Sequence, residues 1–153
     1  MTLYILCGVP GSGKSTMSMQ IAKEQNAKLY GYDAIKRDSK LTSFDDVCEL
    51  IYQRIITDLS NGFNVVYDAP HTKIKHRVDI LEHLAGAYCT KVLIVMKTPL
   101  DECLRRNSRR QGHEYIPEPI IHDFYNSFEP PNLDEGWDEI REVRPYEVNL
   151  TSD

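Results

Sequence analysis

The sequence is short of positive charge and of long apolar runs, and each shortage excludes a class of protein. Its 18 lysines and arginines are outnumbered by 23 aspartates and glutamates, which gives a net charge of −5 over 153 residues. Proteins that bind nucleic acid through bulk positive charge are therefore disfavoured. No apolar stretch approaches the roughly 20 residues that cross a bilayer, so we expect no membrane partner.

Two further patterns are missing. The N-terminus lacks the basic region and the small-residue cleavage site of a secretory signal, which favours a cytoplasmic protein. The four cysteines, Cys7, Cys48, Cys89 and Cys103, form no C-x-x-C pair. This spacing is typical of free thiols in a reducing compartment and not of a disulfide framework or a zinc site.

What the sequence does have is an alternation of two periodicities. Nearly continuous apolar runs, typical of strands covered on both faces of a sheet, occupy residues 2–7, 64–67 and 91–96. Helical periodicity follows at residues 14–25, 43–59, 73–84, 99–110 and 119–128. Ser43 is the predicted N-cap of the second helix, and Gly62 its predicted stop. This alternation predicts an α/β domain built on a parallel sheet.

The C-terminal part is patterned more weakly than the rest. A double proline closes the last strongly periodic helix, and residues 132–153 are acidic. We expect a single domain over residues 1–153, with its core in residues 1–131 and an acidic tail in residues 132–153. A final edge strand is expected within that tail, from Ile140, Val143 and Val148.

The net charge is unevenly distributed along the chain. Residues 129–153 carry a net charge of −6, which leaves +1 on the rest of the chain. A nearly neutral body does not bind long duplexes tightly through charge. It still permits capture of a short nucleic-acid strand end through a few phosphates.

A glycine-rich segment between the first strand and the first helix carries the strongest signal. It fits G-x-x-x-x-G-K-S/T and reads Gly8-Val9-Pro10-Gly11-Ser12-Gly13-Lys14-Ser15-Thr16. Glycines let backbone N–H groups converge on a phosphate, and the start of the following helix adds partial positive charge. Lys14 can reach the β- and γ-phosphates, and Ser15 can place its hydroxyl on Mg²⁺. The segment therefore predicts binding of ATP with Mg²⁺.

The group that receives the phosphate depends on residues at the carboxyl ends of the strands, where open parallel sheets bind ligands. Asp33 follows a short apolar pair and is either a general base toward a hydroxyl or the N-cap of a short helix. Asp68 ends the strand at residues 64–67, where a carboxylate either supports Mg²⁺ or caps a turn. His71 lies three residues further on and is more typical of a loop than of a catalyst.

A basic cluster follows the last predicted strand. Residues 105–110 hold four arginines and no acid. Arg106 and Arg110 are four residues apart, which places them on one face of the predicted helix. They form either a solvated helix end or an arginine-bearing lid over the phosphates. Arg105 points elsewhere and is interpreted as a solvated side chain.

Taken in order, these segments resemble the phage-type polynucleotide 5′-hydroxyl kinase family of P-loop kinases. The resemblance covers residues 3–131. It rests on the phosphate loop, the Asp33 segment, Asp68 with Arg77 nine residues on, and the arginine cluster followed by Ile116-Pro117-Glu118. It implies a P-loop kinase fold, with about four to five parallel strands flanked by helices and an arginine-bearing helical lid.

The resemblance also implies roles for single residues. Lys14, Arg106 and Arg110 would act on the phosphates of ATP, Asp33 would be the general base, and Ser15 and Asp68 would support Mg²⁺. On the acceptor side it implies a set made of Asp33, Lys36, Arg37, Asp68, His71 and Arg77.

This chain departs from the family on the acceptor side. Lys36 stands where the family carries an arginine against the acceptor's phosphate, and lysine lacks the bidentate fork. Asp68-Ala69-Pro70-His71 stands where the family favours Asp-x-Thr-Asn or Asp-x-Thr-His, so a hydroxyl is missing. The expected reaction is transfer of the γ-phosphate of ATP to the 5′-hydroxyl end of DNA or RNA. The alternatives are a small-molecule or nucleotide kinase and a non-catalytic ATP-binding switch, and a homo-oligomer is left open.

Overall fold

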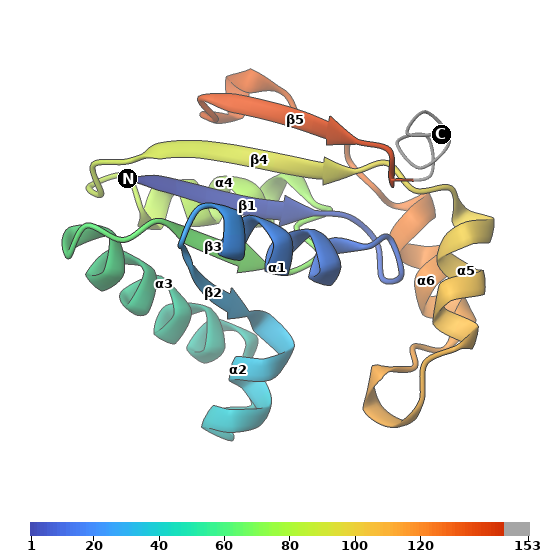
Figure 1. The fold of residues 1–153 in the computed structure, drawn as a ribbon. Coiled ribbons are helices and arrows are strands. Elements are labelled where there is room, and N and C mark those ends of the chain that lie inside the picture. The colour runs from blue at the N-terminus through green and yellow to red at the C-terminus, as the bar shows by residue number, and fades with distance from the viewer. Residues whose placement is uncertain (146–153) are drawn as a thin grey trace.

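The protein is built on one parallel β-sheet. The computed structural model describes residues 1–145. Within them the strands are β1 (Thr2–Cys7), β2 (Lys28–Gly31), β3 (Val65–Asp68), β4 (Thr90–Met96) and β5 (Glu139–Val143). They pair in parallel in the order β2-β3-β1-β4-β5 (Figure 1). The predicted parallel sheet of four to five strands is confirmed.

Six α-helices connect and flank these strands in the described part of the chain. They are α1 (Lys14–Glu24), α2 (Tyr32–Ser39), α3 (Phe44–Ser60), α4 (Ile74–His83), α5 (Leu100–Ser108) and α6 (Glu118–Asn126). The predicted cap of α3 is confirmed, because the Ser43 hydroxyl accepts a hydrogen bond of 3.3 Å from the backbone N–H of Asp46. The predicted helix at residues 99–110 ends earlier than expected, at Ser108.

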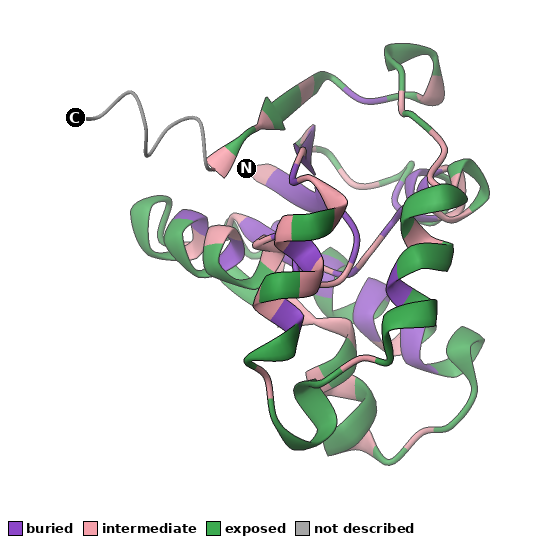
Figure 2. Ribbon diagram, turned by 90° about the vertical axis from the view of Figure 1, so that its right-hand side faces the viewer, coloured by how far each residue is buried: buried purple, intermediate pink, exposed green. Residues whose placement is uncertain are grey.

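Side chains of the central strand β1 alternate between two cores, as the pleat requires. Leu3 and Ile5 lie in the core that α3 and α4 cover, whereas Tyr4 and Leu6 lie in the core on the opposite face of the sheet. Ile21 of α1 closes this second core. Figure 2 shows the buried residues gathered on the strands and on the inward sides of the helices. Both faces of the sheet are covered, which explains the continuous apolar runs in the sequence.

A third, smaller core lies beyond the carboxyl ends of the strands. Val9 of the phosphate loop packs there with Cys103 of α5 and Ile121 of α6. Figure 1 shows α5 and α6 side by side at this end of the sheet. The chain leaves β1 toward β2 and β3 on one side, and later passes to β4 and β5 on the other. The carboxyl end of β1 is thus the point where the strand order reverses, which is where open α/β sheets bind ligands.

Residues 132–145 are part of this fold, although the sequence shows them as an acidic tail. Ile140 and Val143 lie in β5, as expected, and Val148 lies outside the described residues. Trp137 is buried against the main core. The four cysteines are free thiols, as predicted. In residues 1–145 no helix is both long enough and apolar enough to span a membrane.

Candidate active site

The phosphate loop lies against α5, and two of its glycines adopt backbone conformations that favour glycine. Gly11 and Gly13 have φ angles of 85° and 97°, in the left-handed region that favours glycine. A Cβ at Gly11 would stand 2.5 Å from the carbonyl oxygen of Cys103. A Cβ at Gly13 would stand 3.0 Å from a guanidinium nitrogen of Arg106. The loop therefore has the strained, closely approached backbone of a phosphate cradle.

Lys14 begins α1 and folds back over this loop. Its Nζ donates a hydrogen bond of 3.2 Å to the carbonyl oxygen of Val9. Burial lowers the pKa of the Lys14 ammonium below its ordinary value, and the nearby Asp68 carboxylate opposes that shift. A partly buried cation at the start of a helix is well placed to meet the anionic end of a nucleotide.

Ser15 and Asp68 meet across the end of the sheet. The Ser15 hydroxyl donates a hydrogen bond of 3.0 Å to Oδ2 of Asp68, which joins the first turn of α1 to the tip of β3. Burial raises the pKa of the Asp68 carboxyl, and the Lys14 ammonium counteracts part of the effect. The described residues contain no group of three or more His, Cys, Asp or Glu arranged to hold a metal. One hydroxyl with one carboxylate suits Mg²⁺, which takes its other ligands from phosphates and water.

Asp33 lies in the first turn of α2 and is exposed at its surface. The interpretation of Asp33 as an N-cap is wrong, because the N-cap position belongs to Gly31 and no side chain caps this helix. The negative charge of Asp33 contributes to the raised pKa of Asp68, so the two carboxylates are close enough to repel each other electrostatically. Lys36 and Arg37 follow in the last turn of α2 and are exposed.

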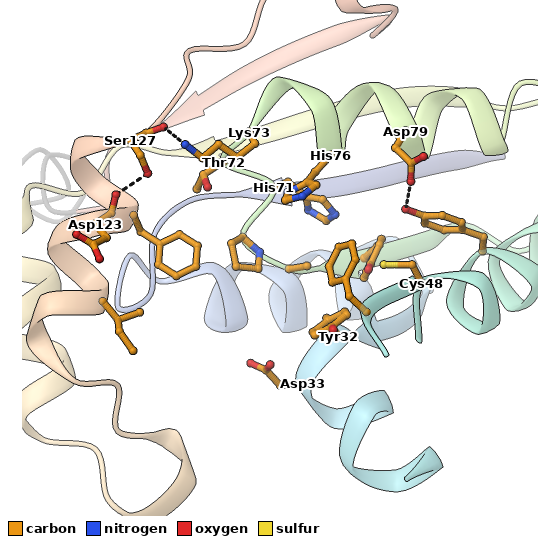
Figure 3. Close-up of a pocket in the computed structure, with 17 residues that line it drawn as sticks. Tyr32, Asp33, Cys48, His71, Thr72, Lys73, His76, Asp79, Asp123 and Ser127 are labelled. Atoms are coloured by element: carbon orange, nitrogen blue, oxygen red, sulfur yellow. Dashed lines mark hydrogen bonds between the residues drawn. The ribbon is translucent and has the colours of Figure 1, made fainter. Parts of the chain in front are cut away.

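A cavity of about 470 Å³ opens beside Asp33, in the size range of small-molecule sites. It lies between the starts of α2, α3 and α4, the end of β3, and α6 (Figure 3). We call it the aromatic cavity, because five phenol or phenyl rings line it, those of Tyr32, Phe44, Tyr52, Tyr67 and Phe124. No pattern in the sequence predicts this cavity, since its rings come from four separate elements.

His71 forms part of the cavity wall in a strained loop. Its φ of 48° is in the left-handed region, and its Nδ1 lies 2.7 Å from the carbonyl oxygen of Leu6. Burial lowers the pKa of the imidazole to about 4. The ring is therefore neutral near pH 7, and Nδ1 carries the proton that is donated to Leu6. Tyr67 contacts this ring edge-on, with the centroids 4.8 Å apart.

Arg77 does not lie on the acceptor surface, which corrects the role implied by the resemblance. Its side chain is fully buried, and its Nε donates to Oε1 of Glu135 at 2.8 Å. Its two terminal nitrogens donate to the carbonyl oxygens of His71 and Glu129, both at 2.8 Å. Arg77 therefore joins the cavity wall at His71 to the segment after α6, and its charge is not available to a ligand.

The arginines of the basic cluster divide into separate positions. Arg106 lies on α5, over the phosphate loop, and its Nε donates to Glu102 at 3.0 Å. Arg105 also pairs with Glu102 and is half-exposed, as the sequence indicated. Arg110 lies beyond the end of α5, so the predicted shared helix face is wrong. Its positive charge nevertheless reaches Lys14, whose pKa it helps to lower.

Asn107 is a residue for which sequence reasoning found no role. It is fully buried, and its amide pairs with the backbone of Ile116 in both directions. Nδ2 donates to the Ile116 carbonyl at 2.6 Å, and Oδ1 accepts from the Ile116 N–H at 2.9 Å. The loop between α5 and α6 is thereby closed at its base. The available signal in the sequence was an uncharged amide side chain among the arginines; its burial in the structure explains the pairing, since a buried amide needs such partners.

Comparison with known proteins agrees with this geometry. The sequence profile of the AAA domain family matches residues 3–131. The L-seryl-tRNA(Sec) kinase of Methanococcus maripaludis is 30% identical over 145 residues, an alignment that covers 89% of this chain and 56% of that protein. The chain thus spans little more than half the length of that relative.

Two solved structures show the likeness of fold. A sugar kinase from Janibacter sp. HTCC2649 superposes with a TM-score of 0.73 at 16% identity, over 99% of this chain and 92% of that one. A chain of the Pnkp1/Rnl/Hen1 RNA repair complex superposes with a TM-score of 0.73 at 24% identity, over 82% of this chain and 43% of that one.

Proposed function

The chain belongs to the AAA domain family and is a P-loop kinase, and on that premise we propose that it transfers the γ-phosphate of ATP to a hydroxyl group held in the aromatic cavity. The observation that carries the proposal is the contact between Ser15 and Asp68. It brings the phosphate loop to the tip of β3, directly beside Asp33 and the cavity.

The residues on the ATP side fit a nucleoside triphosphate with Mg²⁺. In this proposal the backbone N–H groups of the loop and the Lys14 ammonium hold the phosphates, and Arg106 and Arg110 contact them from α5 and its extension; Arg106 borders the loop at Gly13, and the charge of Arg110 acts on Lys14. Ser15 and Asp68 are the residues that would hold Mg²⁺. When bound, the ion neutralises charge on the β- and γ-phosphate oxygens.

The proposed transfer is a direct displacement. The acceptor oxygen forms a bond to the γ-phosphorus, the bond from that phosphorus to the bridging oxygen breaks, and ADP leaves. Asp33 accepts the proton of the hydroxyl, since its carboxylate lines the cavity next to Asp68. Arg106 and Arg110 stabilise the negative charge of the transferring phosphoryl group.

The 5′-hydroxyl end of a short DNA or RNA strand is the first candidate acceptor. The order of the phosphate loop, Asp33, Asp68 and the arginine cluster supports it. The aromatic cavity offers ring faces for a nucleobase to stack on. Lys36 lies one helical turn after Asp33 and supplies one charge for a phosphate of the strand.

A small-molecule alcohol, or the small terminal group of a larger molecule, is the second candidate. It is favoured by the cavity itself, which has the volume of a small-ligand site and no arginine among its described lining residues. The similarity to a kinase whose named acceptor is a seryl group also supports it. The proposed roles of the phosphate loop, Lys14, Ser15 and Asp68 toward ATP are the same for both candidate acceptors.

An acceptor panel tests the proposal. The full chain is incubated with γ-labelled ATP and, separately, with 5′-hydroxyl oligonucleotides of DNA and RNA, nucleosides, sugars and amino alcohols. We expect label in one acceptor class, and Asp33→Asn to abolish it while ATP binding is retained. Label released only as inorganic phosphate, at a rate that Asp33→Asn leaves unchanged, would instead identify an ATP-driven switch.

A further inference from the structure

The charged groups around the aromatic cavity are mostly negative. Asp33, Asp79 and Asp123 contribute carboxylates from α2, α4 and α6, and Lys73 contributes the one ammonium group among the described lining residues (Figure 3). The Nζ of Lys73 already donates a hydrogen bond of 2.8 Å to the backbone carbonyl of Ser127. Three carboxylates against one engaged lysine make the cavity unfavourable for an acceptor that carries its own phosphate.

The two histidines of the cavity do not change this balance. Burial lowers the pKa of His71 to about 4, and burial together with the charge of Lys75 lowers the pKa of His76 below its ordinary value. Both rings are therefore uncharged near pH 7. Their contribution to the cavity is an aromatic face and not a positive charge.

The N-terminus of α4 is also closed to an anionic ligand. This end of the helix borders the cavity at Lys73, and free N–H groups there would attract a phosphate. The N–H of Ile74 instead donates 3.0 Å to Oε1 of Glu129. A carboxylate of the protein thus already engages the first N–H of this helix.

Three of the rings that line the cavity, those of Tyr32, Phe44 and His76, contact one another in order. The centroids of Tyr32 and Phe44 lie 5.5 Å apart, and those of Phe44 and His76 lie 5.4 Å apart. Phe44 is 48% exposed, which leaves part of its ring open to a ligand. Tyr52 donates a hydrogen bond of 3.2 Å to Oδ2 of Asp79, and Oδ1 of the same carboxylate lies 3.4 Å from Nδ1 of His83. Aromatic faces combined with carboxylates recognise ammonium groups.

We propose that the acceptor is an amino alcohol, a molecule that carries a protonated amine a few bonds away from the hydroxyl that receives the phosphate. This inference rests on the proposed function and names the substrate class of the same cavity. The hydroxyl lies at Asp33, and the ammonium group lies against the rings of Tyr32 and Phe44, in a cavity that Asp79 and Asp123 make negative from opposite ends. The ammonium takes no part in bond making, because its proton stays on nitrogen while the hydroxyl proton passes to Asp33.

Matched pairs of acceptors test the inference. The full chain is incubated with γ-labelled ATP and either L-serine methyl ester or methyl 3-hydroxypropanoate, and either glucosamine or glucose. Each pair differs at a single amine-bearing position. We expect kcat/KM for the amine member to exceed that of its partner by about tenfold or more, the scale of one desolvated cation–aromatic contact. Equal labelling within a pair, or labelling of a 5′-hydroxyl dinucleotide in preference to every amine, would overturn the inference and leave the kinase standing.

Variants with conservative changes locate the ammonium site. Asp79→Asn and Asp123→Asn are each expected to reduce the ratio of kcat/KM for the amine member to kcat/KM for the neutral member, by up to about tenfold. Asp79→Asn keeps an oxygen that can accept from Tyr52. The controls are Glu82→Gln on α4 and Glu118→Gln on α6, which remove exposed carboxylates outside the cavity. If the controls and the cavity variants behave alike, the carboxylates have no part in recognition.

Binding separates this inference from the proposed function. Calorimetric titration of the full chain with serine methyl ester, in the presence of a non-hydrolysable ATP analogue, reports the cavity without any transfer. Binding of the ester that Asp79→Asn weakens, without labelling, would support the cavity's preference and contradict the kinase. Absence of both binding and labelling for every amine would contradict the inference.

Discussion

The buried pair of Arg77 and Glu135 gives a quantitative prediction about stability. Glu135→Gln leaves the Arg77 guanidinium fully buried without a counter-ion, while its bonds to the carbonyls of His71 and Glu129 persist. Removing one member of a buried ion pair costs about 3 to 5 kcal/mol, and the two surviving hydrogen bonds place this case at the lower end. For a domain of this size, about 3 kcal/mol lowers Tm by roughly 6 to 12 °C.

The pH dependence of the pair has a definite sign. Burial raises the pKa of Glu135, but the hydrogen bond and charge of Arg77 outweigh that effect and hold the pKa below its ordinary value of 4.5. A carboxyl whose pKa is lower in the folded chain than in the unfolded chain stabilises the fold fully above its unfolded-state pKa. This contribution is lost as the pH falls from the unfolded-state pKa through the folded-state pKa. In the Glu135→Gln variant the free energy of unfolding is expected to lack this part of its decrease at acid pH.

The only tryptophan of the sequence reports directly on this contact. Trp137 is buried, and its Nε1 donates a hydrogen bond of 3.1 Å to Glu135. Denaturant and thermal unfolding followed by its fluorescence therefore measure the loss. The matched control is Glu139→Gln, which breaks an ion pair whose side chains are about half exposed and is expected to cost at most about 1 kcal/mol. A loss for Glu135→Gln no larger than that of the control would refute the reasoning.

Three further predictions concern the active site. Gly13→Ala adds a Cβ at a φ of 97°, 3.0 Å from Arg106, and should abolish binding of a fluorescent ATP analogue without lowering Tm by more than a few degrees. Arg106→Ala should lower kcat by about 10²- to 10³-fold and change the Kd for ATP far less, as measured by steady-state kinetics and calorimetry. Between pH 6.5 and about 4 the unfolded chain binds a proton at His71 that the folded chain does not, so the stability of the wild type decreases as the pH is lowered through this range. Asparagine tolerates the left-handed φ of 48° at this position. His71→Asn should therefore make the free energy of unfolding, measured by denaturant titration, less dependent on pH in this range.

The phosphate side of the site could be predicted from the sequence because its signals are local. The phosphate loop is contiguous, and its chemistry requires glycine, lysine and serine in a fixed order. Asp68 directly follows an apolar strand, so its position at the sheet edge follows from the strand itself. The contact of Asp68 with Ser15, 53 residues away, agrees with that placement.

The acceptor side could not be predicted, because its signals are spread over distant segments. Arg77 follows two lysines in the sequence and looks solvated, yet α4 turns it inward toward Glu135, 58 residues further on. Strand β2 is an edge strand with exposed Lys28 and Leu29, so it shows no continuous apolar run. The rings of the aromatic cavity follow no spacing that a sequence pattern could reveal.

The central claim is that the γ-phosphate passes to a hydroxyl group whose proton Asp33 accepts. Single-turnover transfer from γ-labelled ATP to the acceptor that the panel identifies tests it most directly, in the wild type and in Asp33→Asn. We expect Asp33→Asn to lower the rate of transfer by about 10²- to 10⁴-fold and to leave the calorimetric Kd for ATP essentially unchanged. Transfer by Asp33→Asn at the wild-type rate would contradict the account.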